Sequence, residues 1–192
     1  MLALYLLKKI NLDISIIQTS SNAIGSIFII YNYLYNEKYL EFLKQTVSNV
    51  VDNKNHEGLG NVKAKSTDWH TLLQLDEMKN FHIRVLHTLM CIYKLRSPTP
   101  DAPIEFSFMD SWGMKHKKGD LTTEHIHVPC PWSGAFYMDV PCNTYMYFAD
   151  FNKRIQLQNN MLVLFPGTTK HSVSQHTSDK ERISMAFNIA WK

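Results

Sequence analysis

The spacing of hydrophobic residues changes near residue 104 and separates a helical part of the chain from a β part. A first helix is predicted from the N-cap residue Asn36 to about Val51. The buried stripes of two helices recur at helical spacing: Tyr39, Leu43, Val47 and Val50 in the first, and Met78, Phe81, Val85, Leu89 and Ile92 in the second. Pro98 and Pro100 are predicted to end the second helix.

After residue 104 the chain consists of short strand-like runs separated by turn signals such as Asn159-Asn160 and Pro166-Gly167. Seven runs are predicted as strands: 104–109, 111–116, 133–140, 145–148, 161–165, 171–174 and 182–191. A further strand-like run covers residues 26–33. Short strands at this spacing indicate an antiparallel sandwich or barrel. We expect the two helices to pack on one face of it.

The length of 192 residues fits one domain. We expect a single domain over residues 26–192, with helical support from 36–96 and a β-core from 104–192. Residues 1–25 show no clear period and are predicted to be a leader of uncertain order. A composition of 45% hydrophobic and 19% charged residues is globular and excludes a disordered or fibrous chain. The net charge of only +3 gives no indication of a nucleic-acid partner.

Cys91, Cys130 and Cys142 form an odd set without CxxC spacing, which argues against a disulfide framework and against a structural zinc knuckle. The apolar run at residues 1–7 is too short to span a bilayer. Two lysines follow this run, whereas a secretory signal has its basic residues first. We therefore expect a soluble, cytoplasmic protein with no membrane partner. The apolar residues near the N-terminus leave an oligomeric interface open.

Nine histidines suggest a metal site, but most of them lack the spacing of ligands. Six have no partner at ligand spacing: His56, His70, His82, His87, His116 and His176. His125 and His127 differ, because residues i and i+2 of an extended chain project to the same side. The turn Phe165-Pro166-Gly167 then delivers His171 to a new strand edge. These three imidazoles are the candidate metal ligands.

The last predicted strand alternates between a face of large apolar residues and a face of small residues that carries Arg182 and Ser184. This pair predicts a cavity with a cationic fork at one end. We expect the preceding loop to close a hairpin that places His171 and Arg182 on neighbouring strands. That geometry suits a dicarboxylate or keto acid, with one end on a histidine-held metal and the far carboxylate on Arg182. The alternative is a surface ion pair between Arg182 and Glu181 or Asp179.

These motifs resemble the non-heme Fe(II) and 2-oxoglutarate-dependent oxygenases, in particular a subfamily common in phage and bacterial genomes. The matching pieces stand in family order between residues 112 and 189: WGMKHKKGD, HIH, SGAFY, LVLFP, HSV and ERISMAFNI. The resemblance implies a double-stranded β-helix, a cupin-like jelly roll with the metal at its open mouth. It is compatible with the predicted strands and with two helices packed on one sheet.

Carried over by position, the resemblance places His125 and His171 on the family's two metal-binding histidines. It places Arg182 and Ser184 on the R-x-S pair that binds the carboxylate of 2-oxoglutarate. Tyr137 lies on a strand that often lends this co-substrate a hydroxyl group.

His127 falls where the broader superfamily has Asp or Glu, although the subfamily also shows histidine here. Three neutral imidazoles would leave the site more positive than the usual two histidines and one carboxylate. Three explanations are open. His127 ligates the metal, Asp139 or Asp120 replaces it, or the site uses two protein ligands. The placement of His127 two residues after His125 favours direct ligation.

The resemblance implies an enzyme that binds Fe(II), 2-oxoglutarate and dioxygen. It would couple oxidative decarboxylation of 2-oxoglutarate to C–H oxidation of an unidentified primary substrate. If the chain is encoded by a phage, the enzyme would act in the cytoplasm of the host cell. One alternative is a metal-binding cupin-like protein, an isomerase or a sensor, which has no use for Arg182. Another is a structural jelly roll, of the kind that builds capsids.

Two further groups of residues lie near the expected site. Four aromatic residues are interpreted as core residues and not as a substrate platform: Trp132, Tyr145, Tyr147 and Phe148. Three lysines are interpreted as a solvated strand end and not as an attractor of anionic substrates: Lys115, Lys117 and Lys118.

Overall fold

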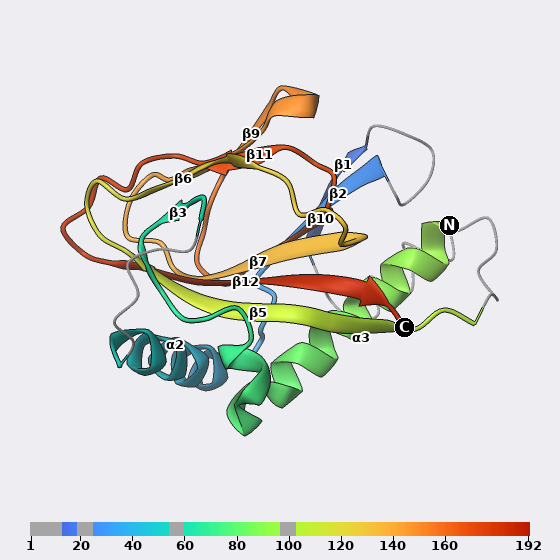
Figure 1. Ribbon diagram of the computed structural model, residues 1–192, viewed down its shortest axis with the longest axis horizontal. Helices are drawn as coiled ribbons and strands as arrows, with labels where there is room; N and C mark the ends of the chain where they lie inside the picture. The colour runs from blue at the N-terminus through green and yellow to red at the C-terminus, as the bar shows by residue number, and fades with distance from the viewer. Residues whose placement is uncertain (1–12, 19–24, 54–59, 97–102) are drawn as a thin grey trace.

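Two antiparallel sheets face each other, and two helices cover the outer side of the larger one (Figure 1). The computed structural model describes residues 13–18, 25–53, 60–96 and 103–192. The larger sheet has the strand order β1 (Asp13–Gln18), β2 (Ser26–Tyr31), β10 (Met161–Pro166), β7 (Trp132–Asp139), β12 (Arg182–Trp191), β5 (Phe106–His116) and β4 (Lys65–Ser66). The smaller sheet has the order β3 (Val62–Lys63), β6 (Leu121–His125), β11 (His171–Val173), β8 (Tyr145–Phe148) and β9 (Lys153–Gln156). This architecture confirms the predicted fold class.

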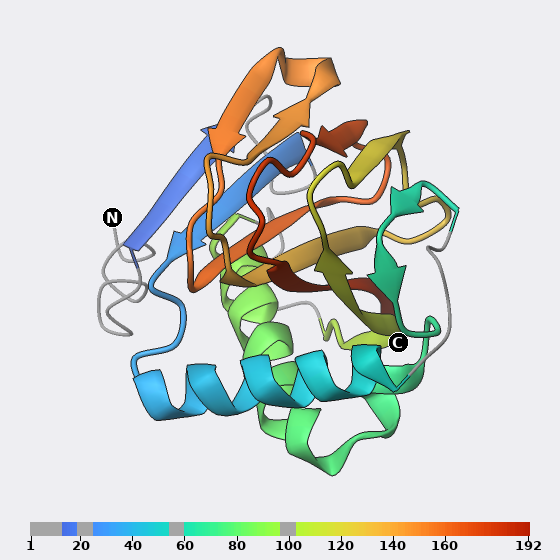
Figure 2. The same cartoon turned by 90° about the vertical axis from the view of Figure 1, so that its left-hand side faces the viewer.

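The helices are α2 (Glu37–Asp52) and α3 (Lys79–Arg96), and Figure 2 shows α2 running across α3 on one side of the larger sheet. The predicted N-cap is confirmed, since the side chain of Asn36 accepts a hydrogen bond from the backbone N–H of Tyr39 at 3.2 Å. Short 3₁₀ turns complete the described elements: η2 (Thr71–Gln74), η3 (Asp76–Met78) and η4 (Ala149–Phe151). No helix in the described ranges is long and apolar enough to cross a membrane.

One hydrophobic core lies between the helices and the larger sheet. Helix α2 contributes Leu43, Val47 and Val51 to this core. Helix α3 and the turn before it contribute the five residues predicted for the second helix: Met78, Phe81, Val85, Leu89 and Ile92. On α2 the third buried residue is therefore Val51, whereas the spacing predicted Val50. Gly113 lets α2 approach β5 closely, because a Cβ at this position would lie 2.8 Å from Cγ1 of Val47.

A second core lies between the two sheets. Phe148 and Val173 from the smaller sheet pack with Trp112, Phe165 and Ala186 from the larger sheet. The alternation of β12 confirms its two predicted faces, since Met185, Phe187 and Ile189 enter the first core and Ala186 the second. Arg182 and Ser184 share the face of Ala186, because they alternate with Met185, Phe187 and Ile189 along the strand. They therefore project toward the space between the sheets.

Several sequence predictions need correction. The two runs 104–109 and 111–116 are parts of one continuous strand, β5, which pairs along β12 from His116 to Phe106. Strand β1 lies inside the supposed leader, where it pairs with β2. The short strands β3, β4, β6 and β9 were not predicted. Positions that lie outside the described residues include His56, Pro98 and Pro100.

The predicted hairpin between His171 and Arg182 is also wrong. Strand β11, which carries His171, belongs to the smaller sheet, and β12 belongs to the larger sheet. The segment between them crosses from one sheet to the other. His171 and Arg182 therefore lie on opposite walls of the space between the sheets and not on adjacent strands.

Candidate active site

The three candidate ligands, His125, His127 and His171, come together at the end of the smaller sheet. His125 ends β6 and is paired in register with His171, the first residue of β11. The ring centroids of these two residues lie 4.3 Å apart, and His127 lies 4.8 Å from His125 and 5.1 Å from His171. The ligand-capable nitrogen atoms of all three lie within 4.8 Å of one another. The structure thus brings together the three histidines that the sequence singled out.

Backbone carbonyl groups fix the ring orientation of two of these histidines. Nδ1 of His125 donates a hydrogen bond to the carbonyl oxygen of Thr123 at 2.8 Å, and Nδ1 of His171 donates one to the carbonyl oxygen of Thr169 at 3.1 Å. A proton on Nδ1 leaves the lone pair of Nε2 free for a metal, and histidine ligands in proteins are commonly oriented in this way.

The spacing of the nitrogen atoms fits a single divalent cation. Nε2 of His127 lies 3.4 Å from Nε2 of His171. Two imidazole nitrogens that each lie about 2.1 Å from one ion are about 3.0–3.4 Å apart at right or tetrahedral angles. The separation of these two atoms is therefore one that a shared metal ion would impose.

Burial keeps the three imidazoles neutral and ready to bind a metal. Burial, with His125 nearby, lowers the pKa of His127 to about 4. Burial, with both other rings nearby, lowers the pKa of His171 to about 3. The pKa of His125 is also lowered by burial, although its hydrogen bond to Thr123 opposes the shift. Neutral imidazole is the form that coordinates divalent first-row metals.

The two aspartates considered as substitutes for His127 are engaged elsewhere. A carboxylate oxygen of Asp139 lies 3.6 Å from Nζ of Lys44. Asp120 accepts a hydrogen bond from the backbone N–H of Lys117 at 2.7 Å. Within the described ranges, the three histidines are the only group of three or more potential metal ligands. The geometry therefore favours His127 over either aspartate as the third ligand.

Gly167 holds the loop that carries His127 against the turn before His171. The N–H of Gly167 donates a hydrogen bond to the carbonyl oxygen of Pro131 at 3.1 Å, and its own carbonyl oxygen accepts one from the N–H of His127 at 2.7 Å. A Cβ at position 167 would lie 2.0 Å from the carbonyl oxygen of Cys130. Only glycine permits this approach. The sequence marked residues 165–167 as a turn but did not reveal its contact with the loop after β6.

The second half of the site is a buried cationic group on the larger sheet. Arg182, the first residue of β12, is only 1% exposed, and its Nε and Nη1 atoms have no hydrogen-bond partner among the described residues. The hydroxyl of the buried Ser184 also lacks a partner there. Tyr137 on β7 is paired in register with Ser184. Because an unpaired buried guanidinium is costly, this cluster is suited to bind an anion.

The two acids proposed as surface partners of Arg182 bind other cations. Glu181 lies 2.8 Å from Nζ of Lys115, and Asp179 lies 3.0 Å from Nζ of Lys118. Lys115 is itself buried between Glu181 and Asp52, so the interpretation of this lysine as part of a solvated strand end was wrong. These contacts leave the guanidinium of Arg182 available to a ligand.

Tyr137 is suited to donate a hydrogen bond near Arg182. Burial raises the pKa of Tyr137 to about 12, although the nearby guanidinium of Arg182 opposes the shift. The phenol therefore keeps its proton at neutral pH. A protonated phenol beside a guanidinium provides one more donor for an anionic group.

Two of the six histidines without ligand spacing, His70 and His82, have polar partners elsewhere in the fold. His70 lies 3.2 Å from a carboxylate oxygen of Asp110, and His82 hydrogen-bonds to the hydroxyl of Ser111 at 3.0 Å. Among the four aromatic residues, Trp132 and Phe148 are buried core residues, as predicted. Tyr147 is 38% exposed, and the ring of the partly buried Tyr145 lies under the guanidinium of Arg154.

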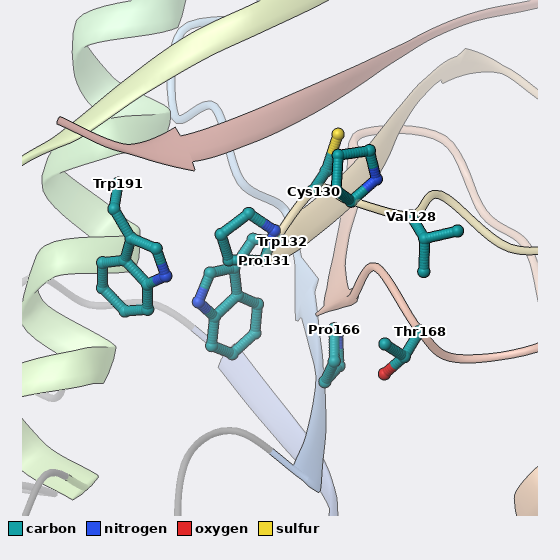
Figure 3. A pocket seen from close by; sticks show the side chains of 8 residues that line it. Val128, Cys130, Pro131, Trp132, Pro166, Thr168 and Trp191 are labelled. Atoms are coloured by element: carbon teal, nitrogen blue, oxygen red, sulfur yellow. The ribbon is translucent and has the colours of Figure 1, made fainter.

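An apolar pocket borders the loop that carries His127 (Figure 3). Its volume is about 370 Å³, and its lining includes Val128, which directly follows His127 in the chain. Figure 3 shows the indole rings of Trp132 and Trp191 on one side of the pocket and Val128 and Thr168 on the other. Sequence patterns did not indicate this pocket, because its walls come from separate segments of the chain.

Comparison with known proteins agrees with this geometry. Residues 150–188 match the model of a family described as "Putative 2OG-Fe(II) oxygenase". This segment includes His171, Arg182 and Ser184. No curated protein matches the sequence significantly.

Solved structures of similar fold include the alpha-ketoglutarate-dependent epimerase SnoN from nogalamycin biosynthesis, with a TM-score of 0.65 and 14% identity over 85% of this chain and 76% of that one. The viral collagen prolyl hydroxylase of Paramecium bursaria Chlorella virus-1 has a TM-score of 0.63 and 13% identity over 85% and 94% of the two chains. A Pseudomonas putida prolyl-4-hydroxylase has a TM-score of 0.62 and 13% identity over 99% of both. Residues 150–188 thus carry the sequence pattern of a 2OG-Fe(II) oxygenase family on a chain with the fold of such oxygenases, which confirms the predicted resemblance at the level of Fe(II) and 2-oxoglutarate-dependent oxygenases.

Proposed function

We propose that this protein is an Fe(II)- and 2-oxoglutarate-dependent hydroxylase whose metal is held by His125, His127 and His171. Arg182 and Ser184, with Tyr137, would bind the distal carboxylate of 2-oxoglutarate. The observation that carries this assignment is the opposition of two sites across the space between the sheets. One is a set of neutral imidazoles with convergent nitrogens, and the other is a buried guanidinium that forms no salt bridge among the described residues and whose Nε and Nη1 have no hydrogen-bond partner there.

Each residue has a defined task in this proposal. The imidazoles of His125 and His171 present Nε2 because their Nδ1 protons are bound to backbone carbonyls. Arg182 orients the co-substrate by a two-pronged interaction with its carboxylate, and the hydroxyl groups of Ser184 and Tyr137 can donate to the same group. Burial of this cluster excludes water and strengthens these interactions.

When bound, iron and 2-oxoglutarate supply the oxidative chemistry, in which dioxygen and 2-oxoglutarate give succinate and CO₂ and one oxygen atom enters a substrate C–H bond. The protein contributes binding, orientation and the exclusion of water. The solved proteins of similar fold include a collagen prolyl hydroxylase and an epimerase, so the fold accommodates more than one outcome at a C–H bond. For this chain we propose hydroxylation of a primary substrate that the apolar pocket beside His127 helps to position.

The test is succinate formation from 2-oxoglutarate after anaerobic reconstitution with Fe(II) and exposure to oxygen. We expect turnover in the wild-type protein and its loss in His171→Ala and Arg182→Ala. His87→Ala is the matched control, because His87 is exposed on α3 and should leave turnover unchanged. Absence of succinate from the wild-type protein under all substrate conditions would contradict the proposal.

The cupin-like alternative, a metal-binding isomerase or sensor, is distinguished by calorimetry. The proposed oxygenase should bind 2-oxoglutarate only when metal is present and should lose this binding in Arg182→Ala. A cupin-like protein without oxygenase activity would bind the metal and be indifferent to Arg182. The buried guanidinium, which has no carboxylate partner among the described residues, supports the oxygenase.

A further inference from the structure

His116 lies beside Arg182 and has no task in the mechanism proposed above. It is the last residue of β5 and is paired in register with Arg182 on the neighbouring strand β12. Side chains of directly paired residues lie on the same face of a sheet and are close neighbours. His116 is 1% exposed, as is Arg182.

The alternation of β5 directs His116 into the space between the sheets. Trp112 and Met114, which precede it at intervals of two, belong to the core between the sheets. Lys115 points the other way and pairs with Asp52 on α2. His116 therefore lies on the same inner face as Arg182 and Ser184, at the end of the site where the distal carboxylate would bind.

Neither ring nitrogen of His116 has a hydrogen-bond partner among the described residues. A buried polar atom without a partner is costly, so a fully buried imidazole with two such atoms is unusual. Its neighbour His176 does not satisfy it. Nε2 of His176 donates to the carbonyl oxygen of Lys180 at 2.7 Å, and its Nδ1 lies 3.4 Å from Sγ of Cys142.

The charges around His116 keep its ring neutral. Burial, with Arg182 and His176 nearby, holds the pKa of His116 well below its usual value. A neutral imidazole has one N–H donor and one acceptor. Arg182, Ser184 and Tyr137 offer donors, so a ligand that accepts several hydrogen bonds at once would complete the cluster. A carboxylate is such a ligand.

We propose that His116 is a further co-substrate-binding residue, which donates an N–H hydrogen bond to the distal carboxylate held by Arg182 and Ser184. This inference rests on the proposed function and adds a residue outside the R-x-S pair. It predicts that His116 favours keto acids that end in a carboxylate over keto acids of the same length that end in a methyl group.

The test is calorimetric titration of the Zn(II)-loaded protein, in which no turnover occurs, with 2-oxoglutarate and with 2-oxopentanoate, which lacks the distal carboxylate. His116→Phe should weaken 2-oxoglutarate binding by about 10- to 100-fold, the usual effect of losing a hydrogen bond to a charged group. Binding of 2-oxopentanoate should not change. His116→Gln keeps an N–H donor and should recover part of the lost affinity.

His82→Phe is the matched control. His82 is a buried histidine that contacts β5 through Ser111 on the helical side, so its replacement should leave 2-oxoglutarate binding unchanged. Thermal unfolding establishes that each variant is folded. If His116→Phe does not fold, ¹⁵N-histidine NMR of the Zn(II)-loaded wild-type protein replaces it. Addition of 2-oxoglutarate should then shift one ring N–H of His116 downfield and slow its exchange with water.

The outcomes separate this inference from the proposed function. If the wild-type protein binds 2-oxoglutarate and Arg182→Ala does not, an unchanged affinity in His116→Phe overturns the role of His116 alone. Equal weakening of both keto acids in His116→Phe, or no NMR response of His116, also overturns it. If the metal-loaded wild-type protein does not bind 2-oxoglutarate, the proposed function and the role of His116 fail together.

Discussion

His125 and His171 face each other directly across the ladder between β6 and β11, with their ring centroids 4.3 Å apart. Each ring is also anchored by the backbone carbonyl two residues before it, at Thr123 and Thr169. The proposed metal centre is therefore built on paired strands, and the orientation of these two rings is fixed by hydrogen bonds within the protein. His127 follows the end of β6 and depends on a loop for its position.

This difference leads to a prediction about the third ligand. His127→Asp should keep metal affinity at least equal to that of the wild-type protein, because it restores an anionic ligand that adds charge attraction for Fe(II). His127→Leu should lower the affinity by about 10–100-fold or more, since even the loss of a group that only orients a ligand has such an effect. Competition of each variant with a chelating dye measures the affinity. If the His127→Leu variant binds metal as tightly as the wild-type protein, the site uses two protein ligands and the assignment of His127 as a ligand is wrong.

The faces of the elements could be predicted from the sequence more reliably than their partners. The alternation along residues 182–191 placed Arg182 and Ser184 on the inner face, and the i, i+2 spacing placed His125 and His127 together, as the structure shows. Alternation fixes which side a residue faces and says nothing about which strand lies alongside. For that reason β11 and β12 were predicted as a hairpin although they belong to opposite sheets.

The missed strands have physical causes as well. Strands β3 and β4 have two residues each, which is too short for a period to be detected. Asp110 interrupts the apolar pattern of β5, yet the strand continues through it: Asp110 is paired in register with Asn188 on β12, and its side chain accepts a hydrogen bond from the Asn188 amide at 2.9 Å. The unpaired state of Arg182 and His116 among the described residues is a tertiary property, which no local pattern of residues could indicate.

Stability should fall in mild acid because of buried histidines. Burial lowers the pKa of His82 to about 4. Between that value and about 6.5, the unfolded chain binds a proton at His82 that the folded chain does not. The free energy of unfolding should therefore decrease as the pH falls through this window, by up to about 1.4 kcal/mol per pH unit for each such histidine, and should not change with this group above it.

Urea denaturation of the metal-free protein between pH 7.5 and pH 4.5 measures this dependence. His82→Phe should have a shallower slope than the wild-type protein, while the exposed His87→Phe should keep the full slope. The same slope in all three proteins would show that His82 titrates normally in the folded state.

Cys142 should be the most reactive thiol. Burial alone would raise its pKa, but hydrogen bonds from Thr144, Thr177 and Ser178 lower it to about 7. The pKa values of Cys91 and Cys130 are instead raised by burial. At pH 7 about half of Cys142 is therefore thiolate, against about 1% or less of an ordinary buried thiol.

Alkylation by iodoacetamide at pH 7, followed by peptide mass spectrometry, should modify Cys142 at least about 10-fold faster than either other cysteine. Thr144→Val removes one hydrogen bond to the sulfur and should slow the reaction of Cys142 without affecting Cys91. Comparable rates at all three cysteines in the wild-type protein would contradict the prediction.

Gly167 contacts the loop that carries His127 of the proposed metal centre, and its replacement should impair both folding stability and metal binding. A Cβ at this position would lie 2.0 Å from the carbonyl oxygen of Cys130 and 3.0 Å from that of His127. Both contacts are with backbone atoms, which cannot turn aside as a flexible side chain would. The loop of His127 must therefore move away from the turn before His171, and the hydrogen bond from the N–H of His127 to the carbonyl oxygen of Gly167 must lengthen.

Gly167→Ala should destabilise the protein by about 1–3 kcal/mol, as overpacking of a close contact does. It should also weaken metal binding by about 10-fold or more, because ligand orientation is lost. Gly60→Ala separates the two effects. Gly60 has a φ of +58° and a Cβ there would have nothing within 4 Å, so alanine costs backbone strain of about 1–2 kcal/mol without touching the site. If Gly167→Ala and Gly60→Ala lose similar stability and bind metal with equal affinity, the position of the His127 loop does not depend on Gly167.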